Sequence, residues 1–87
     1  MARYRIRIKT SAAKEIEAVD QKKDRQRIVT RIQSLAENPR PPGCEKLSGQ
    51  GDKYRVREGH YRVVYSIEDE DRLVYVVKVG HRKDVYR

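Results

Sequence analysis

The chain opens with a strict alternation of apolar and basic side chains over residues 2–9, ARYRIRIK. Successive side chains of a β-strand point to opposite faces of a sheet, so Tyr4, Ile6 and Ile8 would share one face and the basic residues the other. The pattern predicts a half-buried strand with a cationic outer face. We interpret that face mainly as a charged edge that deters aggregation, and phosphate binding is the alternative.

Apolar residues recur at helical spacing in the next two segments. Thr10 and Ser11 would cap a first helix, and a break at Asp20 and Gln21 would separate it from a longer helix over residues 22–37. The apolar stripe of this second helix contains Ile28, Val29, Ile32, Leu35 and Ala36. The pattern predicts a helical hairpin that packs on a sheet. Neither helix carries a catalytic pattern, so we interpret both as scaffold.

Prolines end the helical part of the chain. Residues 38–43, NPRPPG, predict a loop because proline cannot continue a helix, and residues 44–52 extend it. Beyond residue 53 the pattern predicts two β-hairpins in series. The element order is then β-α-α-β-β-β, and the fold class is α+β: a small, mainly antiparallel sheet with an α-hairpin packed on one face. We expect a single domain over residues 1–87.

The register of the first hairpin follows from its turn. With Glu58 and Gly59 as a two-residue turn, Arg55 would lie opposite Arg62, and the apolar and basic residues of the hairpin would segregate onto opposite faces. Like charges directly opposite each other are destabilising. Arg55 facing Arg62 would therefore lower stability unless an anion lies between them.

The second hairpin extends this cationic face. A loop at residues 69–71 would place Arg62 opposite Lys78, and the apolar run Val74–Val77 predicts a central last strand. The predicted cationic face and its margin contain Arg55, Arg57, Arg62, Lys78, His81, Arg82 and Tyr86. In the alternative without a ligand, nearby carboxylates such as Glu58 neutralise part of this face.

The overall charge points to an anionic partner. Lys and Arg number 21 against 13 Asp and Glu, which gives a formal net charge of +8. Most of the basic residues are arginines, whose planar guanidinium groups bind phosphate through two parallel hydrogen bonds. The balance predicts a nucleic acid or an acidic protein as partner. The alternative is a solvated surface that is merely basic.

Several classes of protein are excluded by motifs that the sequence lacks. The single Cys44 cannot form an internal disulfide and has no partner at zinc-ligand spacing. Phosphate-loop, Ser/His/Asp and Cys/His patterns are missing, as is a group of carboxylates and histidines suited to a metal. No apolar run approaches the length of a membrane span, and no signal peptide begins the chain. We therefore expect a cytoplasmic protein with no metal, no other cofactor and no membrane partner.

Metal-free phosphodiester chemistry on RNA fits the residues that remain. A 2′-OH can attack its own phosphate if the site aligns it, stabilises the charge of the transition state and moves protons. Arginine serves the second need, but it stays protonated and cannot serve the third. His81 and Tyr86 are the predicted proton carriers, and His60 is a weaker candidate. The alternatives are an exposed His81 at a strand end and a Tyr86 packed over the sheet.

Two motifs carry a family resemblance. Residues 59–65 read G-x-Y-R-V-x-Y and residues 79–87 read V-G-H-R-x-D-V-Y-R, after a β-α-α start and an NPRP loop. With these features the chain resembles the RelE toxins of the RelE/ParE superfamily, and the resemblance covers essentially its whole length. The resemblance implies an mRNA interferase that enters the ribosomal A site and cuts the codon there without a metal, leaving a 2′,3′-cyclic phosphate. The family's site positions fall on Arg55, Arg57, Arg62, Arg82 and Tyr86.

The predicted site combines both lines of argument. The expected catalytic residues are Arg55, Arg57, Arg62, His81, Arg82 and Tyr86, and the expected RNA-binding residues are Arg55, Arg57, Arg62, Lys78 and Arg82. The best-known members of the family have lysine at the positions of Arg55 and Arg57. Because arginine does not give up its proton, Tyr86 or His81 would have to move it here, or cleavage would be weaker.

The resemblance also implies partners. These are the ribosome, mRNA and a cognate acidic, RelB-like antitoxin that forms a hetero-oligomer with the toxin. Two other functions stay open: a ParE-like toxin that inhibits DNA gyrase without a nuclease site, and a basic RNA-binding module that holds RNA without cutting it. The combined arginine and terminal tyrosine set argues against the ParE-like function.

Overall fold

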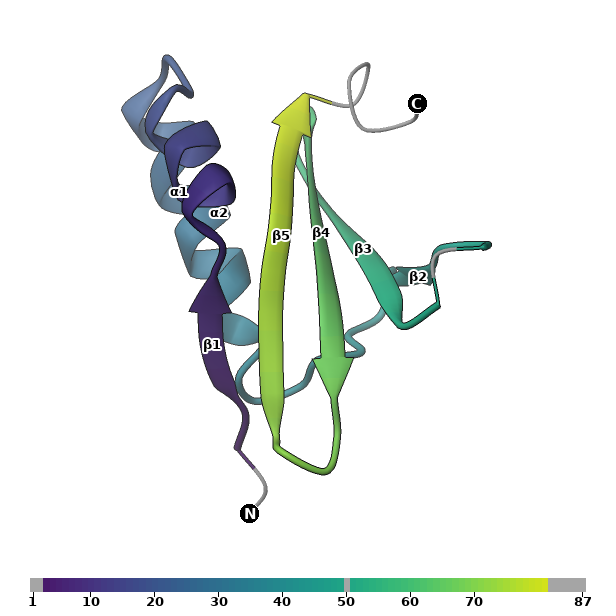
Figure 1. Ribbon diagram of the computed structural model, residues 1–87. Coiled ribbons are helices and arrows are strands. Elements are labelled where there is room, and N and C mark those ends of the chain that lie inside the picture. The colour runs from purple at the N-terminus through teal and green to yellow at the C-terminus, as the bar shows by residue number, and fades with distance from the viewer. Residues whose placement is uncertain (1–2, 50, 82–87) are drawn as a thin grey trace.

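The computed structural model describes residues 3–49 and 51–81. Within these residues the elements are β1 (Arg5–Ile8), α1 (Thr10–Glu17), α2 (Lys22–Ser34), β2 (Glu45–Lys46), β3 (Lys53–Glu58), β4 (Tyr61–Glu68) and β5 (Leu73–His81). The strands form one sheet in the order β1-β5-β4-β3-β2, and the two helices lie on one side of it (Figure 1). The predicted α+β class, with an α-hairpin on a mainly antiparallel sheet, is confirmed.

Strand β5 occupies an inner position in the sheet, as its apolar run predicted. It pairs parallel with β1 on one side and antiparallel with β4 on the other. Strand β1 is therefore an edge strand, and its basic residues Arg5 and Arg7 are exposed. Charged side chains on an edge discourage pairing with another chain.

The core lies between the helices and the sheet. The stripe Ile28, Ile32 and Leu35 is buried, as the helical spacing predicted, and it packs with valines of the inner strands. Burying an aliphatic side chain of this size stabilises the fold by about 1.5–3 kcal/mol. Tyr65 is fully buried among them and donates a hydrogen bond from its hydroxyl to the Pro39 carbonyl oxygen at 2.7 Å. Burial raises the pKa of Tyr65, so its phenol stays neutral.

The predicted register of the first hairpin was wrong by two residues. The turn is Gly59-His60, so Arg57 lies opposite Arg62 and Arg55 lies opposite Val64. Gly59 has a φ of 61°, and glycine at the first central position is what a type II′ turn requires. A shift of two residues keeps every side chain on its face, so the predicted segregation of apolar and basic residues holds.

The second hairpin also differs from its predicted register. Its loop has four residues, 69–72, and Arg72 closes it with a φ of 51°. A β-bulge follows, because Tyr65 pairs with Val76 while the adjacent Val64 pairs with Lys78. Arg62 is therefore opposite Gly80, and the predicted pair of Arg62 with Lys78 was wrong.

Three local predictions need smaller corrections. Helix α1 begins at Thr10 itself, and its capping position is taken by Lys9, whose side chain makes no capping hydrogen bond among the described contacts. Helix α2 ends at Ser34, before the predicted boundary at residue 37. The predicted loop contains the short strand β2, which pairs with β3.

A polar cluster joins the proline-rich loop to the β4–β5 turn. Asp69 accepts hydrogen bonds from the Tyr4 hydroxyl at 2.6 Å and from the Arg40 guanidinium at 3.0 and 3.2 Å. The same guanidinium lies 5.2 Å from the centre of the Tyr54 ring. These contacts lower the pKa of Asp69 from 3.8 to about 2, with Arg40 the largest cause. The cluster thus fixes three segments that are distant in sequence.

Candidate functional site: an arginine hollow

Three of the predicted site residues line one hollow of about 370 Å³. Its lining residues are Arg31, Gly43, Glu45, Arg55, Arg57 and Arg62. Four of these carry guanidinium groups and one carries a carboxylate. We call this cavity the arginine hollow.

Strand pairing brings the predicted arginines together. Arg57 and Arg62 are directly opposite each other on β3 and β4, and Arg55 follows two residues away on the same face of β3. Arg62 is only 5% exposed, and its Nη1 donates a hydrogen bond to the Tyr61 carbonyl oxygen at 3.1 Å. Arg57 lies directly opposite, so two positive charges are concentrated on this face of the sheet. Such a concentration of charge suits an anion that contacts both side chains.

Glu45 is the carboxylate of the arginine hollow. The two-residue strand β2 places it opposite Arg55, whose Nη2 donates a hydrogen bond to Glu45 Oε1. The Arg55 side chain is 15% exposed and that of Glu45 is 62% exposed, so the pair lies at the rim. An ionised carboxylate only accepts hydrogen bonds, so Glu45 can accept a proton where the arginines cannot. Sequence analysis missed this residue because it placed residue 45 in an unstructured loop.

Arg31 is the second site residue that sequence analysis missed. It belongs to α2, in the helical layer, yet it lines the same hollow as the strand arginines. Its Nε atom is buried and has no hydrogen-bond partner among the described residues. The signal was present in the sequence, because residue 31 lies three positions after Ile28 and four before Leu35, at the border of the buried stripe.

Lys78 and His81 do not line the arginine hollow. They line a separate hollow of about 430 Å³ together with Glu15 of α1. Lys78 Nζ lies 3.3 Å from Glu15 Oε2, and the Val79 backbone N–H donates a hydrogen bond to Glu15 Oε1 at 2.8 Å. Glu15 therefore links α1 to β5. Lys78 forms an ion pair with Glu15 in this link.

His81 belongs to an aromatic cluster at the end of β5. It pairs with Tyr61, whose ring meets it edge-on with centroids 5.8 Å apart, and its ring stacks with His60 at 6.1 Å. Tyr61 packs against the core, so this cluster lies on the helical side of the sheet. The remaining predicted site residues, Arg82 and Tyr86, lie outside the described residues.

The chemistry available in the hollow is anion binding. Guanidinium groups present parallel N–H donors that match phosphate oxygens, and their charge stabilises charge that develops on a phosphate.

Over residues 3–49 and 51–81, no group of three or more His, Cys, Asp or Glu residues is arranged to hold a metal ion. No helix in the same ranges is long and apolar enough to cross a membrane.

Comparison with known families gives a match over nearly the whole chain. The family described as "ParE toxin of type II toxin-antitoxin system, parDE" matches residues 6–86. A protein of Escherichia coli named as a RelE-like toxin is 34% identical over 88 residues, which cover 97% of this chain and 90% of the relative. The mRNA interferase toxin RelE of Escherichia coli strain K12 is 34% identical over 61 residues, covering 68% of this chain and 63% of the relative.

A solved structure gives the same result at the level of the fold. The archaeal RelE–RelB complex of Pyrococcus horikoshii contains a chain with a TM-score of 0.80 and 31% identity. The alignment covers 94% of this chain and 97% of that chain. The similarity therefore spans the helices, the sheet and the strands that carry the arginine hollow.

Proposed function

The chain belongs to the ParE toxin family of type II toxin–antitoxin systems, and on that premise we propose that it is a RelE-type, ribosome-dependent endoribonuclease that cuts mRNA in the A site. The observation that carries the proposal is the convergence of Arg55, Arg57 and Arg62 on one hollow. A relative named as an mRNA interferase supports the same activity.

The proposed reaction is attack of a ribose 2′-OH on the adjacent phosphate. The phosphate would sit between Arg57 and Arg62, whose like charges it would neutralise. As the new P–O bond forms and the P–O5′ bond breaks, negative charge grows on the phosphate oxygens, where the guanidinium groups stabilise it. The products are a 2′,3′-cyclic phosphate and a free 5′-OH end.

Proton transfer is the step that arginine cannot perform. Glu45 lies at the rim of the hollow beside Arg55, and its carboxylate is the proton acceptor that we propose for the attacking 2′-OH. This assignment takes the place of His81, which the sequence predicted as a proton carrier but which does not line the arginine hollow. The leaving 5′ oxygen also needs a proton, for which Tyr86 stays the candidate from the sequence.

The proposed partners follow from the family. A solved relative is a RelE–RelB toxin–antitoxin complex, and we propose that an acidic, RelB-like antitoxin forms a hetero-oligomer with this chain and shields its cationic site. The net charge of +8 suits an acidic partner as well as mRNA and the ribosome. The proposed place of action is the cytoplasm, where translating ribosomes are found.

The ParE-like function is the second candidate, because the matching family is described by the ParE toxin. Mapping mRNA 5′ ends by primer extension after brief expression separates the candidates. The endoribonuclease gives new 5′ ends at A-site codons in wild type, and they disappear with Arg57→Ala. Growth arrest with intact mRNA and trapped gyrase–DNA complexes would replace the proposal with the ParE-like function. RNA binding with neither effect would leave a basic RNA-binding module.

A further inference from the structure

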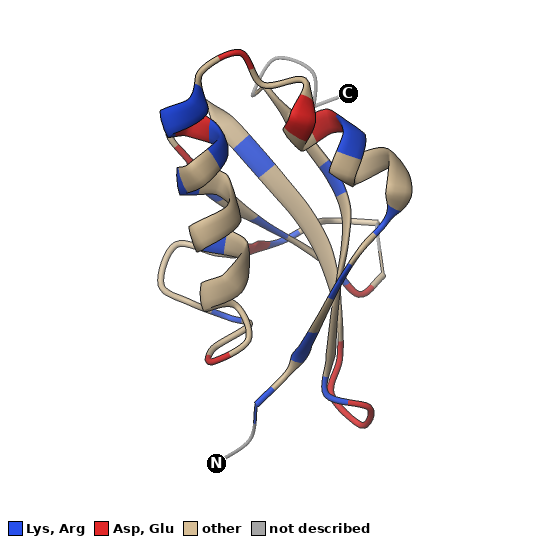
Figure 2. Ribbon diagram, turned by 90° about the vertical axis from the view of Figure 1, so that its left-hand side faces the viewer, with Lys and Arg blue, Asp and Glu red and all other residues tan. Residues whose placement is uncertain are grey.

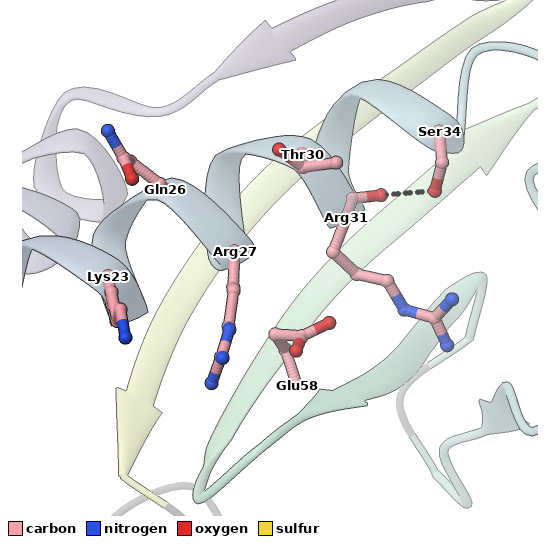
Figure 3. Close-up of a pocket in the computed structure, with 7 residues that line it drawn as sticks. All are labelled: Lys23, Gln26, Arg27, Thr30, Arg31, Ser34 and Glu58. Carbon is pink, nitrogen blue, oxygen red and sulfur yellow. Dashed lines mark hydrogen bonds between the residues drawn. The ribbon is translucent and has the colours of Figure 1, made fainter.

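A second basic cavity adjoins the arginine hollow. A groove of about 620 Å³ lies between α2 and β3, with six lining residues from the helix and Glu58 from the strand. Basic residues mark several turns of α2, and Figure 3 shows Lys23, Arg27 and Arg31 projecting from the side of the helix that faces β3 (Figures 2 and 3). We call this cavity the α2–β3 groove.

The three basic residues form a regular row. They are four residues apart, so they share one helix face and follow each other at a rise of about 6 Å. In the described ranges none of the three forms a salt bridge. Among the described residues that line the groove, Glu58 is the single acidic one, so three positive charges face one negative charge there. The groove therefore has the electrostatic character of an anion site.

Arg31 connects the groove to the arginine hollow. It lines both cavities, and its buried Nε atom has no hydrogen-bond partner among the described residues. A buried donor without a partner lowers stability by about 1–3 kcal/mol, so a ligand oxygen at this position would recover stability. A phosphate bound at Arg31 would therefore lie where the two cavities meet.

The lining residues favour a polynucleotide over a peptide. All seven are polar or charged: Lys23, Gln26, Arg27, Thr30, Arg31, Ser34 and Glu58. An amphipathic helix or a strand that docks in a groove needs apolar pockets for its anchoring side chains. Phosphates instead need guanidinium and ammonium groups, with hydroxyl and amide groups for the phosphate and sugar oxygens. Glu58 can accept a hydrogen bond from a 2′-OH or a base amino group.

We propose that the α2–β3 groove binds the phosphate backbone of the mRNA segment next to the phosphate held in the arginine hollow. This inference rests on the proposed function, since it assigns the flanking part of the same substrate. It gives Lys23 and Arg27 a role in holding RNA, in place of the scaffold role expected for α2.

The test is the length dependence of RNA binding. Fluorescence anisotropy is measured with 2′-O-methyl oligouridylates of two and eight nucleotides, which 2′-OH attack cannot cut. Wild type binds the octamer more tightly than the dimer, and the double variant Lys23→Gln with Arg27→Gln loses most of that gain. The logarithm of the observed binding constant falls linearly with the logarithm of the salt concentration. Each lost phosphate contact on a single strand makes this slope less steep by about 0.7, so the double variant should make it less steep by about 1.4. The matched control is Lys14→Gln with Lys22→Gln, two exposed lysines outside the groove.

Each other outcome overturns the inference. If the control variant loses as much affinity for the octamer as the double variant, only net charge matters. If wild type binds the octamer no more tightly than the dimer, the groove is not used. If RNA affinity stays while affinity for the antitoxin falls, the groove holds an acidic peptide. Because no cleavage is measured, a failure here leaves the cleavage test of the arginine hollow unaffected.

Discussion

Arg57 and Arg62 face each other directly across two strands, and like charges in this position repel each other. Replacing Arg57 by Gln removes the repulsion, so we expect the free energy of unfolding to rise by roughly 0.2–1 kcal/mol. The same change should lower mRNA cleavage, because one guanidinium is lost from the site. Urea denaturation and a cleavage assay on programmed ribosomes measure the two effects.

Arg7→Gln is the control for this substitution. Arg7 is an exposed arginine on edge strand β1, outside the arginine hollow, and its loss removes the same charge. It should leave both stability and cleavage close to wild type. A less stable Arg57→Gln variant, or one that cleaves like wild type, would contradict the role given to this pair.

Glu45 carries the proposed proton transfer. Glu45→Gln keeps the shape of the side chain but removes its capacity to take a proton, so cleavage of bound mRNA should slow by about 10²–10⁴-fold. Binding to programmed ribosomes should not weaken, because the substitution removes a negative charge beside Arg55. Single-turnover cleavage with saturating protein separates the two quantities.

The exposed Glu68, at the far end of β4, serves as the control through Glu68→Gln. Glu68→Gln removes the same negative charge as Glu45→Gln, but Glu68 does not line the arginine hollow. If Glu45→Gln cleaves at the wild-type rate while His81→Ala does not, proton transfer belongs to His81 after all.

Sequence reasoning found the strand arginines but not their complete surroundings. Alternation along β3 and β4 determines a shared face, so Arg55, Arg57 and Arg62 could be grouped from spacing alone. Arg31 comes from another layer, and helical spacing says which side of α2 it occupies but not which strand lies below. Glu45 depended on a two-residue strand, which is too short for any periodicity to reveal.

At the scale of elements, the Asp69 cluster predicts a defined dependence of stability on pH. The folded protein holds the pKa of Asp69 at about 2, below its ordinary value of 3.8, so ionised Asp69 stabilises the fold above pH 3.8. That contribution is lost as the pH falls through 2. Asp69→Asn should therefore be less stable than wild type at pH 6, and the difference should shrink towards pH 2.

Urea denaturation at pH 6 and at pH 2.5 measures this difference. Glu70→Gln changes an exposed position in the same turn, and its free energy of unfolding should stay close to that of wild type at both pH values. A difference between wild type and Asp69→Asn that is constant over this range would show that the carboxylate does not hold Arg40 and Tyr4 in solution.

Element pairing explains why the registers were harder to predict than the elements. Segregation of apolar and basic residues is unchanged by a two-residue shift, so it could not distinguish a turn at residues 58–59 from the observed Gly59-His60. In the second hairpin the loop is one residue longer than predicted, and the β-bulge near Val77 adds a second residue, so Lys78 moves away from Arg62. A bulge adds one residue to one strand only, and the run Val74–Val77 is apolar throughout, so no change of pattern marks it.

At the scale of the whole molecule, one small core supports two basic cavities that meet at Arg31. Helix α2 contributes its apolar stripe to the core and its basic row to the α2–β3 groove, so one element serves both stability and the proposed RNA binding. The short strand β2 completes the arginine hollow at the opposite edge of the sheet from β1. The overall fold could be predicted from the sequence because each of these elements follows its own periodicity.

The central claim is that the arginine hollow promotes attack by the 2′-OH of the mRNA itself. Purified protein is mixed with ribosomes programmed with either an all-ribose mRNA or one with a single 2′-deoxynucleotide immediately 5′ of the cut position, and the new ends are analysed. Our account predicts that wild type cuts the all-ribose mRNA to a 2′,3′-cyclic phosphate, that Arg57→Gln cuts it far more slowly, and that the 2′-deoxy mRNA stays intact. Equal cutting of both mRNAs, or an intact all-ribose mRNA with wild-type protein, would contradict it.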